Sequence, residues 1–282
     1  MSQAAPYLRP GGMAEALEAL ADGDWRIAAG CTDLFPATDR KDLSGPILDI
    51  TRIPELRGIH RHDAGLTIGA ATTWREIARA DLPPAMRGLQ LAAREVGAQQ
   101  IQNRGTLGGN LCNASPAADG VPPLLTLDAE VELASIRGRR RLPLAAFITG
   151  PRQIARGRDE LVTAIHLPAR ALDGVGAFRK LGARTYLVIS IAMVSVRLVV
   201  AGGRVAEAAI AVGACGPVAT RVPAAEAALL GVAPDPARIG ADHVDAVLSP
   251  IDDVRADRAY RRDAALTLIR RGVADAMAPV PA

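Results

Sequence analysis

From residue 100 to residue 119 the chain reads Gln100-Ile-Gln-Asn-Arg-Gly-Thr-Leu-Gly-Gly-Asn-Leu-Cys-Asn-Ala-Ser-Pro-Ala-Ala-Asp119, with glycines at 105, 108 and 109. Glycine has no side chain to keep a ligand away from the main chain, and it enters left-handed conformations at little cost. Successive backbone N–H groups around such glycines, or at the start of a helix beyond them, bind phosphate groups. The segment therefore predicts a loop that holds an anion, and a diphosphate is a natural ligand.

Two further features favour a ligand site over the alternative, a glycine-rich surface turn. A second glycine loop, Ala28-Ala-Gly-Cys-Thr-Asp-Leu34, follows the predicted strand 25–29, and ligands gather at such strand ends. The longer segment also carries more hydrogen-bonding side chains than a turn requires, namely Asn103, Thr106, Asn110, Asn113, Ser115 and Asp119.

The two loops, Ile27–Leu34 and Asn103–Leu111, followed by Ala114-Ser-Pro-Ala-Ala-Asp119, resemble the FAD-binding medium subunit of the molybdenum hydroxylases. That family includes xanthine dehydrogenase and carbon monoxide dehydrogenase. The segment Ala177-Phe-Arg-Lys-Leu-Gly-Ala-Arg184 resembles the family's C-terminal flavoprotein domain, so the resemblance covers nearly the whole chain. It implies an α+β protein. A vanillyl-alcohol-oxidase-like (PCMH-type) FAD-binding domain over 1–172, with subdomains of about 1–55 and 56–172, would precede a C-terminal domain over 173–282 with an antiparallel sheet and helices.

The resemblance also implies a cofactor site. The first loop would surround the diphosphate through its main chain, and Lys180 would lie beside the isoalloxazine, where a cation stabilises the anionic reduced ring. Asp119 would contact a ribose hydroxyl or orient the loop; the alternatives are a helix N-cap for Asp119 and a surface ion pair for Lys180. No side chain is expected to be catalytic or to bind a metal. The expected FAD-binding residues are Ile27, Ala28, Ala29, Gly30, Cys31, Thr32, Asp33, Leu34, Asn103, Thr106, Leu107, Gly108, Gly109, Asn110, Asp119, Leu161, Val162 and Lys180.

The function implied by the resemblance is that of an oxidoreductase subunit that carries FAD and transfers electrons. A large subunit would hydroxylate a substrate at its molybdenum cofactor, and a small subunit would pass the electrons through two 2Fe-2S clusters to this chain's FAD, which would deliver them to an external acceptor. A heterotrimer or a dimer of heterotrimers is expected. The alternatives are a self-contained flavin oxidoreductase and a scaffold subunit that has lost FAD.

The sequence departs from the family pattern at two places. Cys31 stands where relatives often have glycine or asparagine, and either a structural or a reactive thiol fits the sequence. Leu187 and Val188 replace acidic residues found in many relatives, which puts NAD in doubt as the electron acceptor. Tyr186 is expected to supply an aromatic or polar contact there.

Composition excludes other classes of function. Aromatic residues make up 3% of the 282, and the net charge of +3 is spread along the chain, so a nucleic-acid surface is not expected. Three distant cysteines predict neither an iron–sulfur centre nor a disulfide framework. No signal peptide and no apolar run of spanning length is found, which predicts a cytoplasmic protein without a membrane span. Dinucleotide, P-loop and hydrolase motifs are absent.

Periodicity predicts the remaining elements. His60 and His62 are assigned to a solvated hairpin turn, with a metal site as the alternative, and Arg137–Arg141 to a basic turn after an edge strand, with docking of an acidic partner or a nucleotide as the alternative. A two-residue turn at Gly202-Gly203 predicts a hairpin. We expect helices over 13–20, 73–80, 84–96, 224–230, 239–248 and 258–276, and strands over 25–29, 47–50, 66–71, 131–134, 160–167, 194–200 and 205–212.

Overall fold

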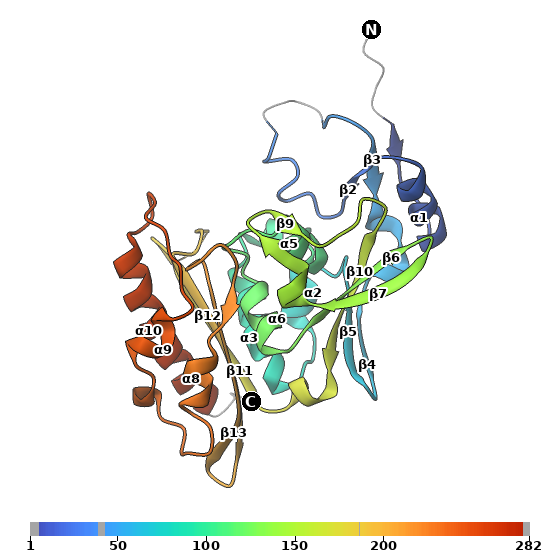
Figure 1. The fold of residues 1–282 in the computed structure, drawn as a ribbon. Helices are drawn as coiled ribbons and strands as arrows, with labels where there is room; N and C mark the ends of the chain where they lie inside the picture. The colour runs from blue at the N-terminus through green and yellow to red at the C-terminus, as the bar shows by residue number, and fades with distance from the viewer. Residues whose placement is uncertain (1–5, 39–42, 186, 279–282) are drawn as a thin grey trace.

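The computed structural model describes residues 6–38, 43–185 and 187–278, and Tyr186 lies outside these ranges. Figure 1 shows three parts: an N-terminal unit in blue, a central region of sheet and helices, and a C-terminal sheet backed by helices in orange and red. Each part has its own buried apolar cluster. The expected α+β class is confirmed.

The N-terminal unit pairs a small parallel sheet with one helix. Strands β1 (Tyr7–Leu8), β3 (Ile47–Asp49) and β2 (Arg26–Ala28) lie in that order. Helix α1 (Met13–Asp22) buries Ala16 and Leu20, which stand four residues apart and so share one face of the helix. Strand β2 ends at the first glycine loop, as its sequence predicts.

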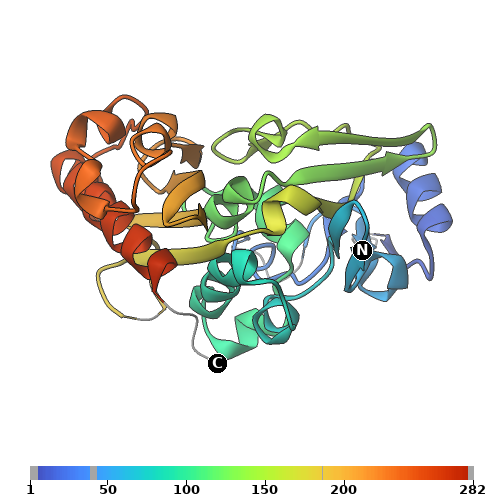
Figure 2. The same ribbon diagram turned by 90° about the horizontal axis from the view of Figure 1, so that it is seen from below.

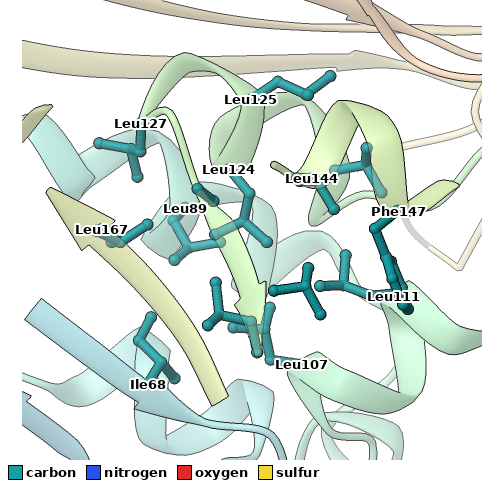
Figure 3. Close-up of a cluster of buried hydrophobic side chains, with 14 of the residues drawn as sticks. Ile68, Leu89, Leu107, Leu111, Leu124, Leu125, Leu127, Leu144, Phe147 and Leu167 are labelled. Carbon is teal, nitrogen blue, oxygen red and sulfur yellow. The ribbon is translucent and has the colours of Figure 1, made fainter. Parts of the chain in front are cut away.

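The central sheet is antiparallel, with strand order β4-β5-β10-β6-β7. Its apolar face packs against short helices in a cluster that includes Leu107, Leu111, Leu124 and Phe147 (Figure 3). Helix α2 begins at a capping box in which Thr73 and Glu76 bond each other's backbone. The elements are β4 (Ile59–His62), β5 (Gly65–Gly69), β6 (Glu130–Ser135), β7 (Gly138–Pro143), β10 (Leu161–Pro168), α2 (Trp74–Arg79), α3 (Arg87–Glu95), α4 (Gln99–Gln102), α5 (Leu107–Asn113) and α6 (Val121–Thr126).

Two predictions for this sheet are wrong. Strand β6 is not an edge strand, because β10 and β7 flank it on both sides. The basic run forms most of the edge strand β7 instead of a turn, because Arg139 pairs with Glu132 at 2.6 Å and Arg140 with Glu160 at 2.6 Å, which neutralises the run within the protein. His60 and His62 likewise lie on β4 and not in the turn that follows it.

The C-terminal sheet, in the order β11-β12-β13-β14, is antiparallel and has helices on both faces (Figures 1 and 2). Successive side chains of β12 alternate, so Val194 and Val196 meet Gly272 of α10 while Ser195 reaches Thr126 of α6. The expected hairpin at Gly202-Gly203 joins β12 and β13. The elements are β11 (Val175–Leu181), β12 (Ala192–Ala201), β13 (Arg204–Gly213), β14 (Thr220–Arg221), α8 (Pro223–Ala227), α9 (Ala241–Asp245) and α10 (Arg258–Met277).

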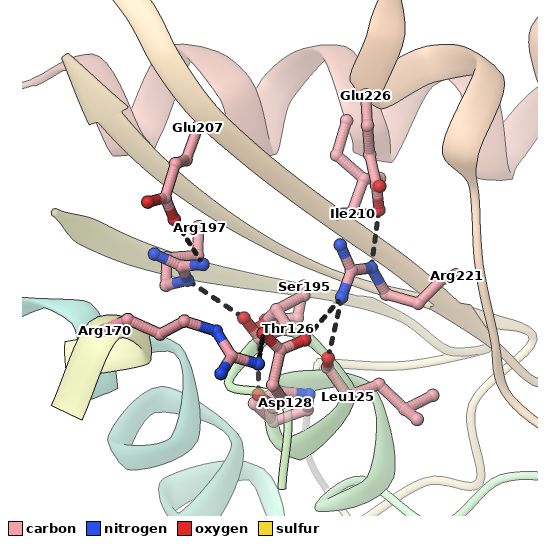
Figure 4. A network of polar contacts seen from close by, with 11 residues as sticks. Leu125, Thr126, Asp128, Arg170, Ser195, Arg197, Glu207, Ile210, Arg221 and Glu226 are labelled. Carbon is pink, nitrogen blue, oxygen red and sulfur yellow. Dashed lines mark hydrogen bonds and ion pairs between the residues drawn. The ribbon is translucent and has the colours of Figure 1, made fainter. Parts of the chain in front are cut away.

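Arginines of the C-terminal sheet bind the last turn of α6 (Figure 4). Arg197 Nε donates to the carbonyl of Thr126 at 2.9 Å, and Arg221 donates to that of Leu125 at 3.1 Å. Carbonyls in the last turn of a helix lack the usual intrahelical donors, and cations are favoured at that end. The Leu125 carbonyl also accepts from the N–H of Asp128 at 3.3 Å. The contacts hold the C-terminal sheet against the central region.

Short elements complete the described chain. The β-strands are β8 (Ile148–Gly150) and β9 (Gln153–Ile154), the one-turn α-helix is α7 (Leu144–Phe147), and the 3-10 helices are η1 (Ile50–Arg52), η2 (Pro54–Leu56), η3 (Pro84–Met86), η4 (Ala169–Leu172) and η5 (Pro236–Arg238). No helix among the described residues has both the length and the apolar character needed to cross a bilayer.

Candidate functional site

A cavity of about 810 Å³ lies where the glycine loops, the central sheet and the C-terminal sheet meet. The loop after β2 contributes Gly30, and the first turn of α5 contributes Gly108 and Gly109. Strand β10 contributes Leu161 and Val162, and β11 contributes Lys180. Its volume falls within the range of about 300–1,000 Å³ that is usual for cofactor sites. We refer to it as the main cavity.

All but three of the residues expected at the cofactor line this cavity. Ala28 is buried and lines an adjoining cavity, Leu107 is buried in the central apolar cluster, and Asn103 is exposed and accepts a hydrogen bond from Arg75. The residues that do line it are Ile27, Ala29, Gly30, Cys31, Thr32, Asp33, Leu34, Thr106, Gly108, Gly109, Asn110, Asp119, Leu161, Val162 and Lys180.

Two of the glycines allow backbone segments to touch. A Cβ atom on Gly30 would lie 1.9 Å from the carbonyl oxygen of Arg104, and one on Gly108 would lie 2.7 Å from that of Ala70. The N–H of Gly108 donates to Ala70 at 2.8 Å, and that of Gly109 to the Thr106 hydroxyl at 3.1 Å. These N–H groups are therefore used within the protein, and the expectation that they bind an anion is wrong for this part of the second loop.

Gly109 and Asn110 form the part of the second loop that faces the cavity. A Cβ atom on Gly109 would approach only the Thr106 hydroxyl, at 2.8 Å, and would otherwise project into the cavity. The Asn110 side-chain oxygen is buried without a hydrogen-bond partner among the described residues. A buried polar atom of this kind is costly unless a ligand or water satisfies it. This wall therefore suits a polar ligand that approaches the backbone closely.

The first loop supplies the free backbone donors. Within the described chain, the N–H groups from Gly30 to Leu34 donate to no protein acceptor. Cys31 adopts φ +60°, the left-handed conformation with which a short turn aims successive N–H groups into one concavity. Burial, and secondarily Asp49, raise the pKa of the Cys31 thiol. A protonated thiol is a poor nucleophile, so a structural role fits better than a reactive one.

Lys180 and Asp119 form a buried ion pair in the cavity wall. The Lys180 Nζ lies 2.9 Å from Asp119 Oδ2 and donates to the Glu95 carbonyl at 3.4 Å, while the Ser190 hydroxyl donates to Asp119 Oδ1 at 3.2 Å. Burial raises the pKa of Asp119, and the charge and hydrogen bond of Lys180 oppose this rise. Asp119 is thus not an N-cap, since Gly120 is the N-cap of α6 and no side chain caps this helix. Lys180 is not part of a surface pair.

Other lining residues were not expected at the site. Arg156 lines the cavity and donates to the Glu160 carbonyl at 2.7 Å. Cys112, an exposed cysteine, also lines the cavity. Leu187 and Ile189, with exposed fractions of 52% and 62%, place apolar side chains beside Lys180 in the lining. In the sequence, the one signal for this segment was that Leu187 and Val188 stand where many relatives have acidic residues. No local sequence pattern indicated that Arg156 would line the cavity.

No group of three His, Cys, Asp or Glu side chains within the described ranges could hold a metal ion. His60 Nε2 lies 3.2 Å from the Arg57 carbonyl, and His62 Nε2 lies 2.9 Å from the Thr67 hydroxyl. Both histidines are exposed on β4.

The sequence matches two known families along its length. Residues 2–170 match the family described as the FAD binding domain in molybdopterin dehydrogenase, and residues 176–276 match the CO dehydrogenase flavoprotein C-terminal domain. The chain is 36% identical to the xanthine dehydrogenase FAD-binding subunit of Escherichia coli O157:H7 over 61% of each protein. It is 31% identical to the nicotine 6-hydroxylase medium subunit of Paenarthrobacter nicotinovorans over 96% of each.

Solved structures give the same similarity. A carbon monoxide dehydrogenase from Hydrogenophaga pseudoflava that lacks the Mo-pyranopterin moiety superimposes with a TM-score of 0.87, at 30% identity and 96% coverage of both chains. Quinoline 2-oxidoreductase from Pseudomonas putida 86 gives a TM-score of 0.86 at 27% identity, covering 97% of this chain and 96% of that one. The similarity therefore covers nearly the whole chain.

Proposed function

Because the chain belongs to the family of FAD-binding domains of molybdopterin dehydrogenases, we propose that it is the FAD-carrying, electron-transferring medium subunit of a molybdenum hydroxylase. Its fold is the expected PCMH-type FAD-binding domain followed by a CO dehydrogenase flavoprotein-like domain. The observation that carries the proposal is the main cavity, where free backbone donors, an open glycine wall and a buried cation face one space.

The residues present fit FAD. The N–H groups of the first loop offer donors to a diphosphate, Gly109 leaves room for close approach, and Asn110 has an unpaired polar atom. Leu161 and Val162 exclude water from their part of the wall. When bound, FAD supplies electron-transfer chemistry that side chains lack. The chain's own contribution is to hold it and to place the positive charge of Lys180, fixed by Asp119, in the cavity wall.

The assembly is part of the same proposal. Relatives named as medium subunits or medium chains imply companion subunits. We infer a small subunit with two 2Fe-2S clusters that delivers electrons to FAD, a large subunit with the molybdenum cofactor, and an external acceptor that removes the electrons. We also infer a heterotrimer or a dimer of heterotrimers. A location in the cytoplasm fits a chain whose three cysteines are unpaired.

The domain boundary also belongs to the proposal. We place the first domain at 1–172, with subdomains at about 1–55 and 56–172, and the second domain at 173–282. The two family matches flank position 172, and the apolar clusters lie largely within the three segments. The main cavity then lies between units, as cofactor sites commonly do.

The test is the visible absorption spectrum of the purified chain after incubation with FAD and removal of the free FAD by gel filtration. We expect the bands of oxidised flavin in the parent and in Gly11→Val, where an added Cβ meets nothing within 4 Å. Gly109→Val should fold but lose the bands, because its side chain would enter the cavity. A parent that stays colourless would favour the scaffold alternative, and turnover of a small molecule by the chain alone would favour the self-contained oxidoreductase.

A further inference from the structure

A second, smaller cavity of about 290 Å³ lies beside the first glycine loop. Arg9, Arg57 and Arg104 line it, so we call it the arginine cavity. It also receives the side chain of Asn103, which was expected at the cofactor but does not line the main cavity. Its other lining residues are Ala29, Gly30, Thr51, Ala71, Thr73 and Thr106.

The charge of this cavity is only partly balanced within the protein. Arg9 Nε lies 3.3 Å from Asp49, and Arg57 donates to the Thr51 carbonyl at 3.4 Å. The Arg104 guanidinium has no hydrogen-bond or ion-pair partner among the residues that the structure describes. No aspartate or glutamate lines the cavity. An excess of positive charge therefore faces a concave space.

The arginine cavity is separate from the main cavity. The first loop touches the second at Gly30, where a Cβ would lie 1.9 Å from the Arg104 carbonyl, so no channel passes between them at this point. None of the three arginines lines the main cavity. The two spaces share only Ala29, Gly30 and Thr106 as a common wall.

We propose that the arginine cavity binds a phosphate-type oxyanion, independently of the ligand of the main cavity. Guanidinium groups bind phosphate through paired, charge-assisted hydrogen bonds. The volume suits one phosphate group and not a dinucleotide. The oxyanion comes either from free phosphate or from a phosphate monoester.

The experiment is calorimetric titration of the full chain, with and without FAD, at constant ionic strength. Inorganic phosphate and AMP are the two probes. We expect saturable phosphate binding that FAD does not abolish, and at least tenfold weaker binding in Arg104→Gln. Arg271→Gln, which removes an exposed, unpaired arginine of α10, should bind like the parent. Tighter binding of AMP than of phosphate identifies an ester as the source, and the reverse identifies free phosphate.

The proposal would be overturned by no saturable binding of either probe, by equal binding by the parent and Arg104→Gln, or by displacement of phosphate by FAD. Equal weakening in Arg271→Gln would also overturn it, because general charge would then account for the effect. Arg57→Gln repeats the test at a second exposed arginine, should Arg104→Gln unfold. FAD binding is scored separately by absorption, so failure of the arginine cavity and failure of the proposed function give different results.

Discussion

Cys31 carries the backbone strain of the first glycine loop. Its φ of +60° lies in the left-handed region, which costs a residue with a Cβ roughly 1–2 kcal/mol. Cys31→Gly removes this cost but adds unfolded-state entropy of about 0.5–1 kcal/mol. We expect Cys31→Gly to raise the free energy of unfolding by up to about 1 kcal/mol, and Cys31→Val to lower it by more than that. Urea unfolding of the FAD-free chain measures both.

Cys31→Ser is the matched control, because it keeps the size and the left-handed backbone while it removes the thiol. It should unfold within about 0.5 kcal/mol of the parent, as changes without a named mechanism do. If Cys31→Gly and Cys31→Ser are both clearly less stable than the parent, the thiol contact with the Ala29 carbonyl, at 3.5 Å, outweighs the strain. The resemblance to relatives with glycine or asparagine at this position agrees with the strain account.

At the scale of single residues, the sequence predicted the location of the main cavity more accurately than the contacts that form its walls. Both glycine loops were recognised, because glycine is a local signal. The sequence did not show why residue 30 must be a glycine, because its neighbour Arg104 is 74 positions away and contacts it only in the folded chain. Leu107 and Gly109 show the same limit. The orientation of α5 places Leu107 in the apolar core and Gly109 at the cavity. The sequence motif of the loop does not predict that orientation.

At the scale of the element, Glu132 ties β6 to both of its neighbours. It pairs with Arg139 and Arg141 of β7 and accepts from Thr163 of β10 at 2.8 Å. Its burial alone would raise the pKa, but the bonds from Thr163 and Arg139 outweigh this and lower the pKa to about 2. The difference from 4.5 corresponds to about 3 kcal/mol, and screening of the half-exposed arginines reduces it to about 2.

Glu132→Gln should therefore lower the free energy of unfolding at pH 7 by about 2 kcal/mol, as measured by urea unfolding. The folded-state pKa is below the unfolded one, so this stabilisation is complete above about pH 4.5 and is lost as the pH falls toward 2. The gap between parent and variant should narrow over that window. Glu55→Gln, at an exposed glutamate without a described partner, should show no gap at either pH. A gap that stays constant below pH 4 would contradict the argument.

Strand order could not be predicted from local pattern. Period-two alternation located β5, β10, β12 and β13, and Gly202-Gly203 located one hairpin. The partner of β6 on its inner side is β10, which follows β6 only after β7, the one-turn helix α7 and the short strands β8 and β9. The basic run was predicted to be a turn because its charges have no acidic partners nearby in the sequence. In the fold, Arg139 pairs with Glu132 of β6, and Arg140 pairs with Glu160, directly before β10.

At the scale of the whole molecule, Lys180 and Asp119 join the two proposed domains through a buried charge pair. Arg179, the next residue on β11, pairs with Asp275 of α10 at 2.5 Å, but that pair is half-exposed and lies within the C-terminal domain. Breaking a buried pair leaves one charge uncompensated and costs roughly 3–5 kcal/mol, whereas exposed pairs contribute at most about 1 kcal/mol. Lys180→Met should therefore destabilise the chain much more than Arg179→Met.

The pH dependence and a double variant identify the cause. Burial already raises the folded-state pKa of Asp119, and removal of Lys180 takes away the group that opposes the rise. An acid with a raised folded pKa binds its proton more tightly when folded, so stability falls as pH rises from the unfolded pKa through the folded one. The deficit of Lys180→Met, measured by urea unfolding, should thus be smaller at pH 5 than at pH 8. Adding Asp119→Asn should recover more than half of it at pH 8. If the double variant is as unstable as the sum of the single ones, the pair is not coupled, and the domains are held mainly by the bonds from Arg197 and Arg221 to the last turn of α6.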